Sequence, residues 1–363
     1  MTVQVRSFAK INLGLRIGAT RQDGFHELLT VYQTIGLHDV IRVSLRRGSG
    51  IEIRCSDPRV PKDESNTCYR VAEKAMQAMK AKGRVVIEIE KRLPVQGGLG
   101  GASSNGVATL LALERSLKQA LPATERLRIA AEVGSDLPLF LVGGTVLGVG
   151  RGEQVYPLED LPATACVVVT PEVGVSTPKA FAEWDRLYGE YEQTVTALRE
   201  HLAEARNFIE AQPEGLDPAR KQEIIASERK LTPKSPSDRM IELGRGLSAW
   251  LSESYSGAPR QISRRGRAEN PLLELVRAGI KNDFEEVVFP EYPELSEGKS
   301  ALECAGARYA SLSGSGSTLY GLFASKEAAR KAELRLRRQS WAAQATATLT
   351  RGQYWRRILI VDF

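Results

Sequence analysis

The residues best suited to chemistry gather in a glycine-rich stretch at 94–105, Pro-Val-Gln-Gly-Gly-Leu-Gly-Gly-Ala-Ser-Ser-Asn. A β-branched run at 85–90 precedes it and an apolar run at 107–113 follows it, so we expect a loop between a strand and a helix. Glycines let a ligand approach the backbone, and a helix N-terminus offers unpaired N–H groups to an anion. The stretch therefore predicts a phosphate-binding loop. A glycine-rich turn with a Ser or Asn helix cap is the alternative.

Three further polar side chains are candidates for the same chemistry. Lys10 and Asn12 alternate along an expected strand at 9–17, so they should point to the same side. Asp136 follows an expected helix at 123–133. The alternative for Lys10 and Asp136 is a surface salt bridge or a carboxylate that merely flanks a helix.

The elements that must position these residues are mixed strands and helices without a strict βαβ repeat, which favours an α+β fold. Residues 308–324 read as two strands and 326–338 as a helix, a closing pattern typical of half a ferredoxin-like unit. The other expected strands lie at 2–8, 28–35, 39–45, 51–54, 143–150, 153–158 and 166–170, and the other expected helices at 67–79, 177 onward, 184–209, 238–251, 270–280 and 292–305.

The chain is longer than a typical single domain, so two lobes are expected, at 1–163 and 164–363. Within the second lobe, apolar positions at three-four spacing and a polar, charged tract predict a helical insertion at about 184–267.

The composition narrows the class of protein. With 42% hydrophobic and 26% charged residues and no long apolar stretch, the chain is expected to be cytoplasmic, without a membrane partner. A net charge of +6 suits a polyanionic small molecule better than a nucleic acid. The four cysteines and three histidines lack metal-ligand spacing, so no protein-bound metal site is expected.

Three separated stretches, 8–13, 94–105 with Asp136 beyond it, and 311–318, together resemble the three motifs of the GHMP kinase superfamily. That superfamily includes galacto-, homoserine, mevalonate and phosphomevalonate kinases. The resemblance implies a two-lobe GHMP kinase fold whose ferredoxin-like C-terminal lobe carries the insertion. It also implies phosphoryl transfer from ATP. The loop is not a Walker A motif, because no Gly-Lys-Ser/Thr ends it.

Four segments, 9–13, 23–28, 91–94 and 134–138, are similar to one branch of that superfamily. Its members phosphorylate the 2-hydroxyl of 4-diphosphocytidyl-2-C-methyl-D-erythritol in the non-mevalonate isoprenoid pathway. The Asp-Gly-aromatic-His-Glu sequence at 23–27 is the most discriminating piece.

The resemblance implies roles for individual residues. Asp136 would accept the proton of the substrate hydroxyl or hold it in line, and the charge of Lys10 would keep Asp136 ionised. The implied substrate-binding residues are Asn12, Phe25, His26 and Thr177, with His26 and Phe25 at the cytosine end. The implied ATP-binding residues are Asn66, Lys91, Pro94, Gly97, Gly98, Leu99, Gly100, Gly101, Ala102, Ser103 and Ser104. Mg²⁺ would arrive with ATP, held mainly by phosphate oxygens and water, with Ser103 or Ser104 as a possible further ligand.

Each implied role has a simpler alternative. Asn12 would be an exposed strand residue, His26 a strand-edge histidine beside a core aromatic, and Lys91 a solvated charge. Asn66 and Thr177 would be helix caps.

The chain also departs from the branch. Phe25 replaces the usual Tyr, Gln96 and Ala102 replace a small residue and a third glycine, and Gly106-Val107 replaces an alanine pair. The rival functions are a GHMP kinase for a mevalonate- or homoserine-type alcohol and a non-catalytic nucleotide or metabolite sensor. A monomer or a homodimer is expected.

Overall fold

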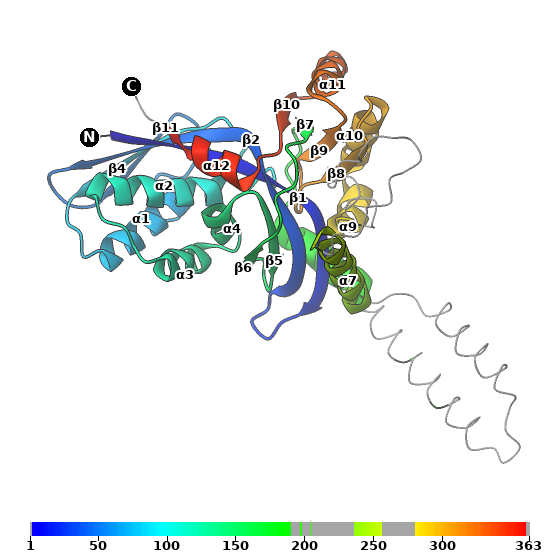
Figure 1. The fold of residues 1–363 in the computed structure, drawn as a ribbon, viewed down its shortest axis with the longest axis horizontal. Helices are drawn as coiled ribbons and strands as arrows, with labels where there is room; N and C mark the ends of the chain where they lie inside the picture. Colours follow the sequence, from blue (N-terminus) through cyan, green and yellow to red (C-terminus); the bar gives the residue numbers. More distant parts are fainter. Residues whose placement is uncertain (1, 190–196, 198–203, 205–235, 256–279, 361–363) are drawn as a thin grey trace, which may run out of the picture.

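The computed structural model describes residues 2–189, 197, 204, 236–255 and 280–360 (Figure 1). Its longest strands are antiparallel neighbours, β1 (Thr2–Thr20) and β2 (His26–Arg46). The sequence predicted separate shorter strands within each of these spans. That prediction is wrong, because each strand is continuous and the breaks in alternation in β1 are register shifts at residues 8–10 and 12–14.

These two strands are the centre of a seven-stranded sheet with the order β11-β1-β2-β4-β3, from which β5 and β6 branch off β2. The pair β3–β4 is parallel and the other pairs are antiparallel. The remaining strands of the sheet are β3 (Ile51–Cys55), β4 (Arg84–Glu90), β5 (Thr145–Val149), β6 (Gln154–Pro157) and β11 (Leu359–Ile360).

Four helices lie on one side of this sheet (Figure 1). They are α1 (Thr67–Ala78), α2 (Gly101–Leu117), α3 (Ala123–Val133) and α4 (Leu137–Val142). Their apolar faces, including Val71, Val107 and Phe140, share one core with Ile41 and Ile87 of the sheet. That core therefore fixes the two helix N-termini, of α2 and α4, that carry the candidate loop and Asp136.

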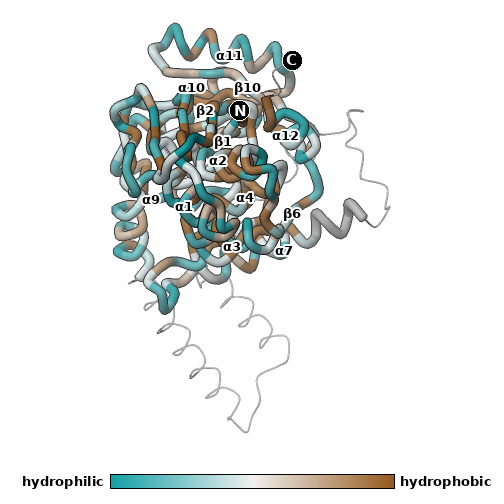
Figure 2. The backbone as a smooth tube through the Cα atoms, turned by 90° about the vertical axis from the view of Figure 1, so that its left-hand side faces the viewer, coloured by the Kyte–Doolittle hydropathy of each residue, from teal (hydrophilic) through white to brown (hydrophobic). Residues whose placement is uncertain are grey.

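The second sheet has four antiparallel strands in the order β10-β7-β9-β8. Its elements are β7 (Ala165–Val169), α9 (Phe284–Glu291), α10 (Pro293–Cys304), β8 (Tyr309–Leu312), β9 (Leu319–Phe323), α11 (Lys326–Arg338) and β10 (Ala343–Ala347). This is the βαββαβ order of a ferredoxin-like unit, so the predicted α+β class and ferredoxin-like C-terminal lobe are confirmed. The polar α11 lies along one edge of the molecule (Figure 2).

After β10 the chain returns to the first sheet. Helix α12 (Arg351–Ile358) packs Tyr354 and Ile358 into the first core, and β11 pairs with β1. The predicted division into 1–163 and 164–363 assigns this segment to the second lobe, whereas its contacts lie on the first. For the residues before that segment, the division into two lobes at 163/164 stays a proposal.

Two helices come from the region of the predicted insertion. A helix begins at residue 177 and is described as far as 189, and α7 is Pro236–Tyr255. Leu243 and Leu247 of α7 join a core that lies between the two sheets. The rest of the predicted insertion at 184–267, and the helix predicted at 270–280 except its last residue, lie outside the described residues. Among the helices that the structure describes, none is long and apolar enough to cross a bilayer.

Candidate active site

The glycine-rich loop leads from β4 into α2 and is held by a loop of the second sheet. Gly98 has a φ of +75°, and a Cβ there would lie 2.2 Å from the carbonyl oxygen of Ser313. Only glycine allows this close approach. The Ser313 hydroxyl donates a hydrogen bond to the Gly98 carbonyl (3.0 Å), and the Thr318 N–H donates to the Gly97 carbonyl (3.2 Å). Residues 313–317 therefore support the glycine loop.

The N-terminus of α2 has no side-chain cap. Its N-cap residue is Gly100, with a φ of +67°, so the alternative of a Ser or Asn helix cap is wrong. The first N–H groups of a helix need partners from outside the helix. Here those of Gly101, Ala102 and Ser103 belong to residues that line a pocket, which suits an anion.

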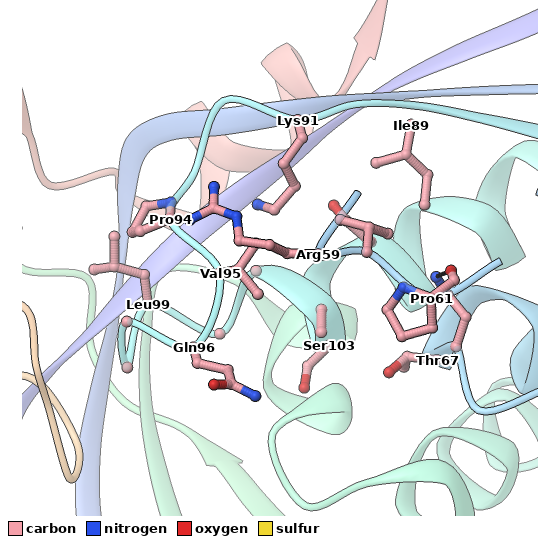
Figure 3. A pocket seen from close by; sticks show the side chains of 18 of the residues that line it. Arg59, Pro61, Thr67, Ile89, Lys91, Pro94, Val95, Gln96, Leu99 and Ser103 are labelled. Carbon is pink, nitrogen blue, oxygen red and sulfur yellow. Dashed lines mark hydrogen bonds between the residues drawn. The ribbon is translucent and has the colours of Figure 1, made fainter. Parts of the chain in front are cut away.

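That pocket has a volume of about 350 Å³ and lies between the glycine loop and the start of α1 (Figure 3). The implied ATP-binding residues that line it are Asn66, Lys91, Pro94, Gly97, Gly98, Leu99, Gly100, Gly101, Ala102 and Ser103. Arg59 and Gln96 line it as well. Ser104 is buried beneath the loop, where its hydroxyl accepts a hydrogen bond from Ser7 (2.7 Å).

A buried carboxylate, Asp39, fixes one wall of the pocket. Lys91 donates to it from Nζ (2.7 Å), and the backbone N–H groups of Arg92 and Leu93 donate at the same distance. The amide of Asn105 donates to it as well (3.1 Å). Only 8% of the Lys91 side chain is exposed, so the alternative of a solvated charge is wrong.

Asn66 is the N-cap of α1, which is the alternative that the sequence allowed for it. Its Oδ1 accepts a hydrogen bond from the Cys68 N–H (2.8 Å) and its Nδ2 donates to the Pro61 carbonyl (2.6 Å). Its side chain thus shapes the pocket wall from the start of α1.

The candidate catalytic residues meet at the opposite end of the glycine loop. Lys10 is 4% exposed, and its Nζ lies 3.3 Å from Asp136 Oδ2 and donates to Asn12 Oδ1 (2.7 Å). Its backbone N–H donates to the Leu99 carbonyl of the glycine loop (3.0 Å). A Cβ on Gly100 would lie 3.0 Å from the Lys10 side chain. The ammonium group is therefore placed between the loop and the carboxylate.

Asp136 stands where a carboxylate commonly caps a helix, directly before α4, yet its side chain makes no cap bond. Its Oδ1 accepts a hydrogen bond from the Tyr32 hydroxyl (3.1 Å) and its Oδ2 faces Lys10. The side chain is 30% exposed, so the carboxylate is held from two sides and open on a third. Because Lys10 is buried, the contact is not a surface salt bridge, although Asp136 does flank α4.

Tyr32 reaches Asp136 because two glycines leave room for its ring. A Cβ on Gly148 would lie 2.5 Å from the ring, and one on Gly152 would lie 2.4 Å from the hydroxyl. Burial and the neighbouring Asp136 charge raise the pKa of Tyr32 well above its ordinary value. The phenol therefore stays protonated and donates.

His26 and Phe25 lie at the hairpin end of the two long strands. Phe25 is 52% exposed, and the Arg151 guanidinium lies 4.9 Å from the centre of its ring. His26 is buried, stacks on Phe181 with ring centres 4.7 Å apart, and places Nε2 2.7 Å from Asp185 Oδ1. Phe25 is exposed and is therefore not the core aromatic of the alternative reading, whereas His26 does lie at a strand end beside a packed aromatic, Phe181.

Two other implied substrate residues are held by protein contacts. Asn12 is 1% exposed and donates to Thr30 (2.8 Å) while it accepts from Lys10, so it is not an exposed strand residue. Thr177 lies at the first residue of its helix, where its hydroxyl bonds to that of Ser315 (2.7 Å).

Several residues of this region were not found from the sequence. They are Tyr32, Asp39, Arg59, Phe181, Asp185 and Asn282. Asn282 is buried and donates to the carbonyls of Leu312 and Gly314 (2.9 and 2.7 Å), which fixes the loop that supports the glycines. A single buried amide or carboxylate gives no periodic signal. The spacing of Thr177, Phe181 and Asp185, four residues apart on a helix, was the one pattern that could have revealed a shared face.

Comparison with known proteins agrees with this architecture. The family model for the GHMP kinases N terminal domain matches residues 66–144, and that for the GHMP kinases C terminal matches 268–342. A crystal structure of a homoserine kinase from Cytophaga hutchinsonii shares the fold, with a TM-score of 0.62 over 96% of this chain and 95% of that chain, at 19% identity. Fold and site together define a kinase of the GHMP class.

Closer relatives narrow the class. The 4-diphosphocytidyl-2-C-methyl-D-erythritol kinase of Solibacter usitatus is 34% identical over 89% of this chain and 82% of the relative. That of Acaryochloris marina is 33% identical over 90% and 87%. A crystal structure of 4-(cytidine 5'-diphospho)-2C-methyl-D-erythritol kinase aligns with a TM-score of 0.63 and 27% identity, over 95% of this chain and 98% of that one. The chain belongs to the family of 4-diphosphocytidyl-2-C-methyl-D-erythritol kinases.

Proposed function

We propose that this kinase transfers the γ-phosphoryl group of ATP to the 2-hydroxyl of 4-diphosphocytidyl-2-C-methyl-D-erythritol. The observation that carries the proposal is the pairing of Lys10 with Asp136 (3.3 Å) beside an uncapped helix N-terminus and a glycine loop. Family membership supplies the substrate.

In this proposal Asp136 accepts the proton of the hydroxyl or orients that hydroxyl for in-line attack. Lys10 neutralises charge that develops near the transferred group, and the N–H groups of the glycine loop bind the phosphates. Asn12 holds Lys10 in position and Thr177 contacts the substrate. His26 and Phe25 bind the cytosine ring by hydrogen bonding and stacking.

The proposed nucleotide pocket takes adenosine between Asn66 and Lys91, with the phosphates along the loop from Pro94 to Ser104. Among the described residues no cluster of three acidic, His or Cys side chains could hold a metal ion. The donor set fits Mg²⁺ that is bound mainly through phosphates and water, with the Ser103 hydroxyl as the open protein ligand. When bound, Mg²⁺ neutralises phosphate charge. A cytoplasmic location and a monomeric or homodimeric state complete the proposal.

A coupled assay of ADP release tests the proposal. We expect turnover with the cytidine diphosphate alcohol, dependent on Mg²⁺, and at most a small fraction of that rate with mevalonate or homoserine. Asp136→Asn and Lys10→Ala should each lower kcat by about 100-fold or more while the thermal unfolding midpoint changes little. A higher rate with another alcohol would show that this alcohol, and not the cytidine diphosphate compound, is the substrate. ATP binding without any turnover would favour the sensor.

A further inference from the structure

One helix presents three polar or aromatic side chains to residues of the proposed substrate site. Thr177, Phe181 and Asp185 are spaced four residues apart in the helix at 177–189, so they share a face and span about 12 Å along its axis. Thr177 bonds to Ser315 in the loop that supports the glycines, whereas Phe181 and Asp185 both contact His26. This face connects the phosphate end of the site to its hairpin end.

The contact between His26 and Asp185 determines which ring nitrogen carries the proton. An ionised carboxylate only accepts hydrogen bonds, so at 2.7 Å from Asp185 the Nε2 of a neutral His26 must be the protonated nitrogen. The other nitrogen, Nδ1, is then a hydrogen-bond acceptor. Within the described part of the chain, the hydrogen bonds of the His26 ring, to Asp185 and to Thr20, are both made by Nε2. Nδ1 is therefore available to a ligand.

The ring is also fixed in orientation. His26 is 7% exposed and lies nearly parallel to Phe181, with an angle of 11° between the rings. Phe181 in turn meets Phe284 edge to face. A buried imidazole that is stacked on one side and hydrogen-bonded at one nitrogen cannot easily turn over to exchange its two nitrogens.

We propose that Asp185 is a specificity residue. By accepting the Nε2–H of His26 it leaves Nδ1 as an acceptor, which selects a pyrimidine that carries an exocyclic amine, as cytosine does, over one that carries a carbonyl there, as uracil does. The inference rests on the proposed function, in which His26 binds the base. Without Asp185, His26 could carry its proton on Nδ1 at little cost. Nδ1–H would then donate a hydrogen bond to the uracil carbonyl.

The kinetic test compares the cytidine diphosphate substrate with its uridine diphosphate analogue. We expect the wild type to favour the cytidine compound in kcat/KM by at least about 100-fold. Asp185→Ala and Asp185→Asn should lower that preference about tenfold, chiefly because KM for the uridine analogue falls, with kcat for cytidine unchanged. Glu183→Gln is the matched control, because Glu183 is an acid of the same helix whose carboxylate pairs with Arg186 rather than with His26.

A second measurement does not depend on activity. The chain has three histidines, so the ring nitrogens of His26 can be assigned by ¹⁵N NMR through comparison with a His26→Gln variant. We expect Nε2 protonated and Nδ1 unprotonated in the wild type, and a mixture of both forms in Asp185→Ala. The inference would be overturned, even if turnover is normal, by either of two results. One is unchanged protonation of the His26 nitrogens in Asp185→Ala, and the other is an unchanged ratio of kcat/KM for the cytidine and uridine compounds in both Asp185 variants. If His26→Gln leaves KM for the cytidine substrate unaltered, the base site of the proposed function fails as well.

Discussion

At the scale of single residues, the arrangement around Asp136 makes the Tyr32 hydroxyl a positioning group. Tyr32→Phe keeps the ring in the space left by Gly148 and Gly152 but removes the donor to Asp136 Oδ1. A hydrogen bond to a charged group contributes about 1.5–3 kcal/mol, so we expect kcat to fall at least about tenfold, with KM for both substrates nearly unchanged. Because the pKa of Tyr32 is raised well above its ordinary value, the loss should be the same from about pH 6 to pH 9.

Tyr354→Phe is the matched control for Tyr32→Phe. It removes another buried tyrosine hydroxyl, which donates to the Phe140 carbonyl (2.7 Å) rather than to Asp136. We expect this variant to lose about 1 kcal/mol of unfolding free energy and to keep its kcat. Equal loss of kcat in the two variants would show that Tyr32 acts through stability rather than through Asp136.

The sequence identified residues of this region by type and local spacing, and missed those defined by tertiary contacts. Lys10 and Asn12 were predicted on one side of a strand, and they are hydrogen-bonded. Tyr32 and Asp39 lie in stretches of β2 where the neighbouring side chains are buried as well, so burial does not single them out. Nothing in the local pattern indicates that one reaches Asp136 and the other anchors Lys91.

At the scale of elements, the glycine loop depends on the loop of the second sheet against which it packs. Gly98→Ala should cost about 1–2 kcal/mol of unfolding free energy for its left-handed backbone alone, and more because the new Cβ would lie 2.2 Å from the Ser313 carbonyl oxygen. The loop must move to relieve this contact. We therefore expect KM for ATP to rise at least about tenfold, measured by the coupled assay with a thermal unfolding curve for each protein.

Gly306→Ala separates the backbone cost from the contact. Gly306 also has a positive φ (+99°), but no atom lies within 4 Å of the position that a Cβ would take. This variant should lose about 1–2 kcal/mol of unfolding free energy and keep its KM for ATP. A similar rise in KM in both variants would contradict the role assigned to the packing of the two loops.

Sequence patterns predicted most helices and strands, with α3 matching at both ends (Ala123–Val133). They did not predict that β1 and β2 are continuous, because a bulge breaks the alternation of side chains without ending the hydrogen-bonded ladder. They also assigned no element after residue 338. A two-residue strand such as β11 (Leu359–Ile360) carries no periodicity, and its pairing with β1 depends on contacts between the two ends of the chain.

At the scale of the whole molecule, the last described segment of the chain packs on the first sheet, close to the helix that follows Asp136. Tyr354 of α12 is 1% exposed and packs so closely on Gly143 that a Cβ there would lie 2.4 Å from the ring. Its hydroxyl donates to Phe140 in α4, the helix that directly follows Asp136. The C-terminal helix thus restrains the element that positions the carboxylate.

Tyr354→Ala should therefore lower stability and activity together. Removing a large buried aromatic side chain costs about 3–5 kcal/mol, so we expect a clear fall in the unfolding midpoint, measured in urea. At a temperature where the variant is still folded, kcat should also fall, because α4 loses the buried ring of Tyr354, which the Tyr354→Phe variant retains. The neighbouring Trp355→Ala is the control, since Trp355 is 38% exposed and its ring nitrogen donates to the Val142 carbonyl, at the far end of α4. A Tyr354→Ala variant with unchanged stability, or a folded one with unchanged kcat, would show that the C-terminal helix does not restrain Asp136.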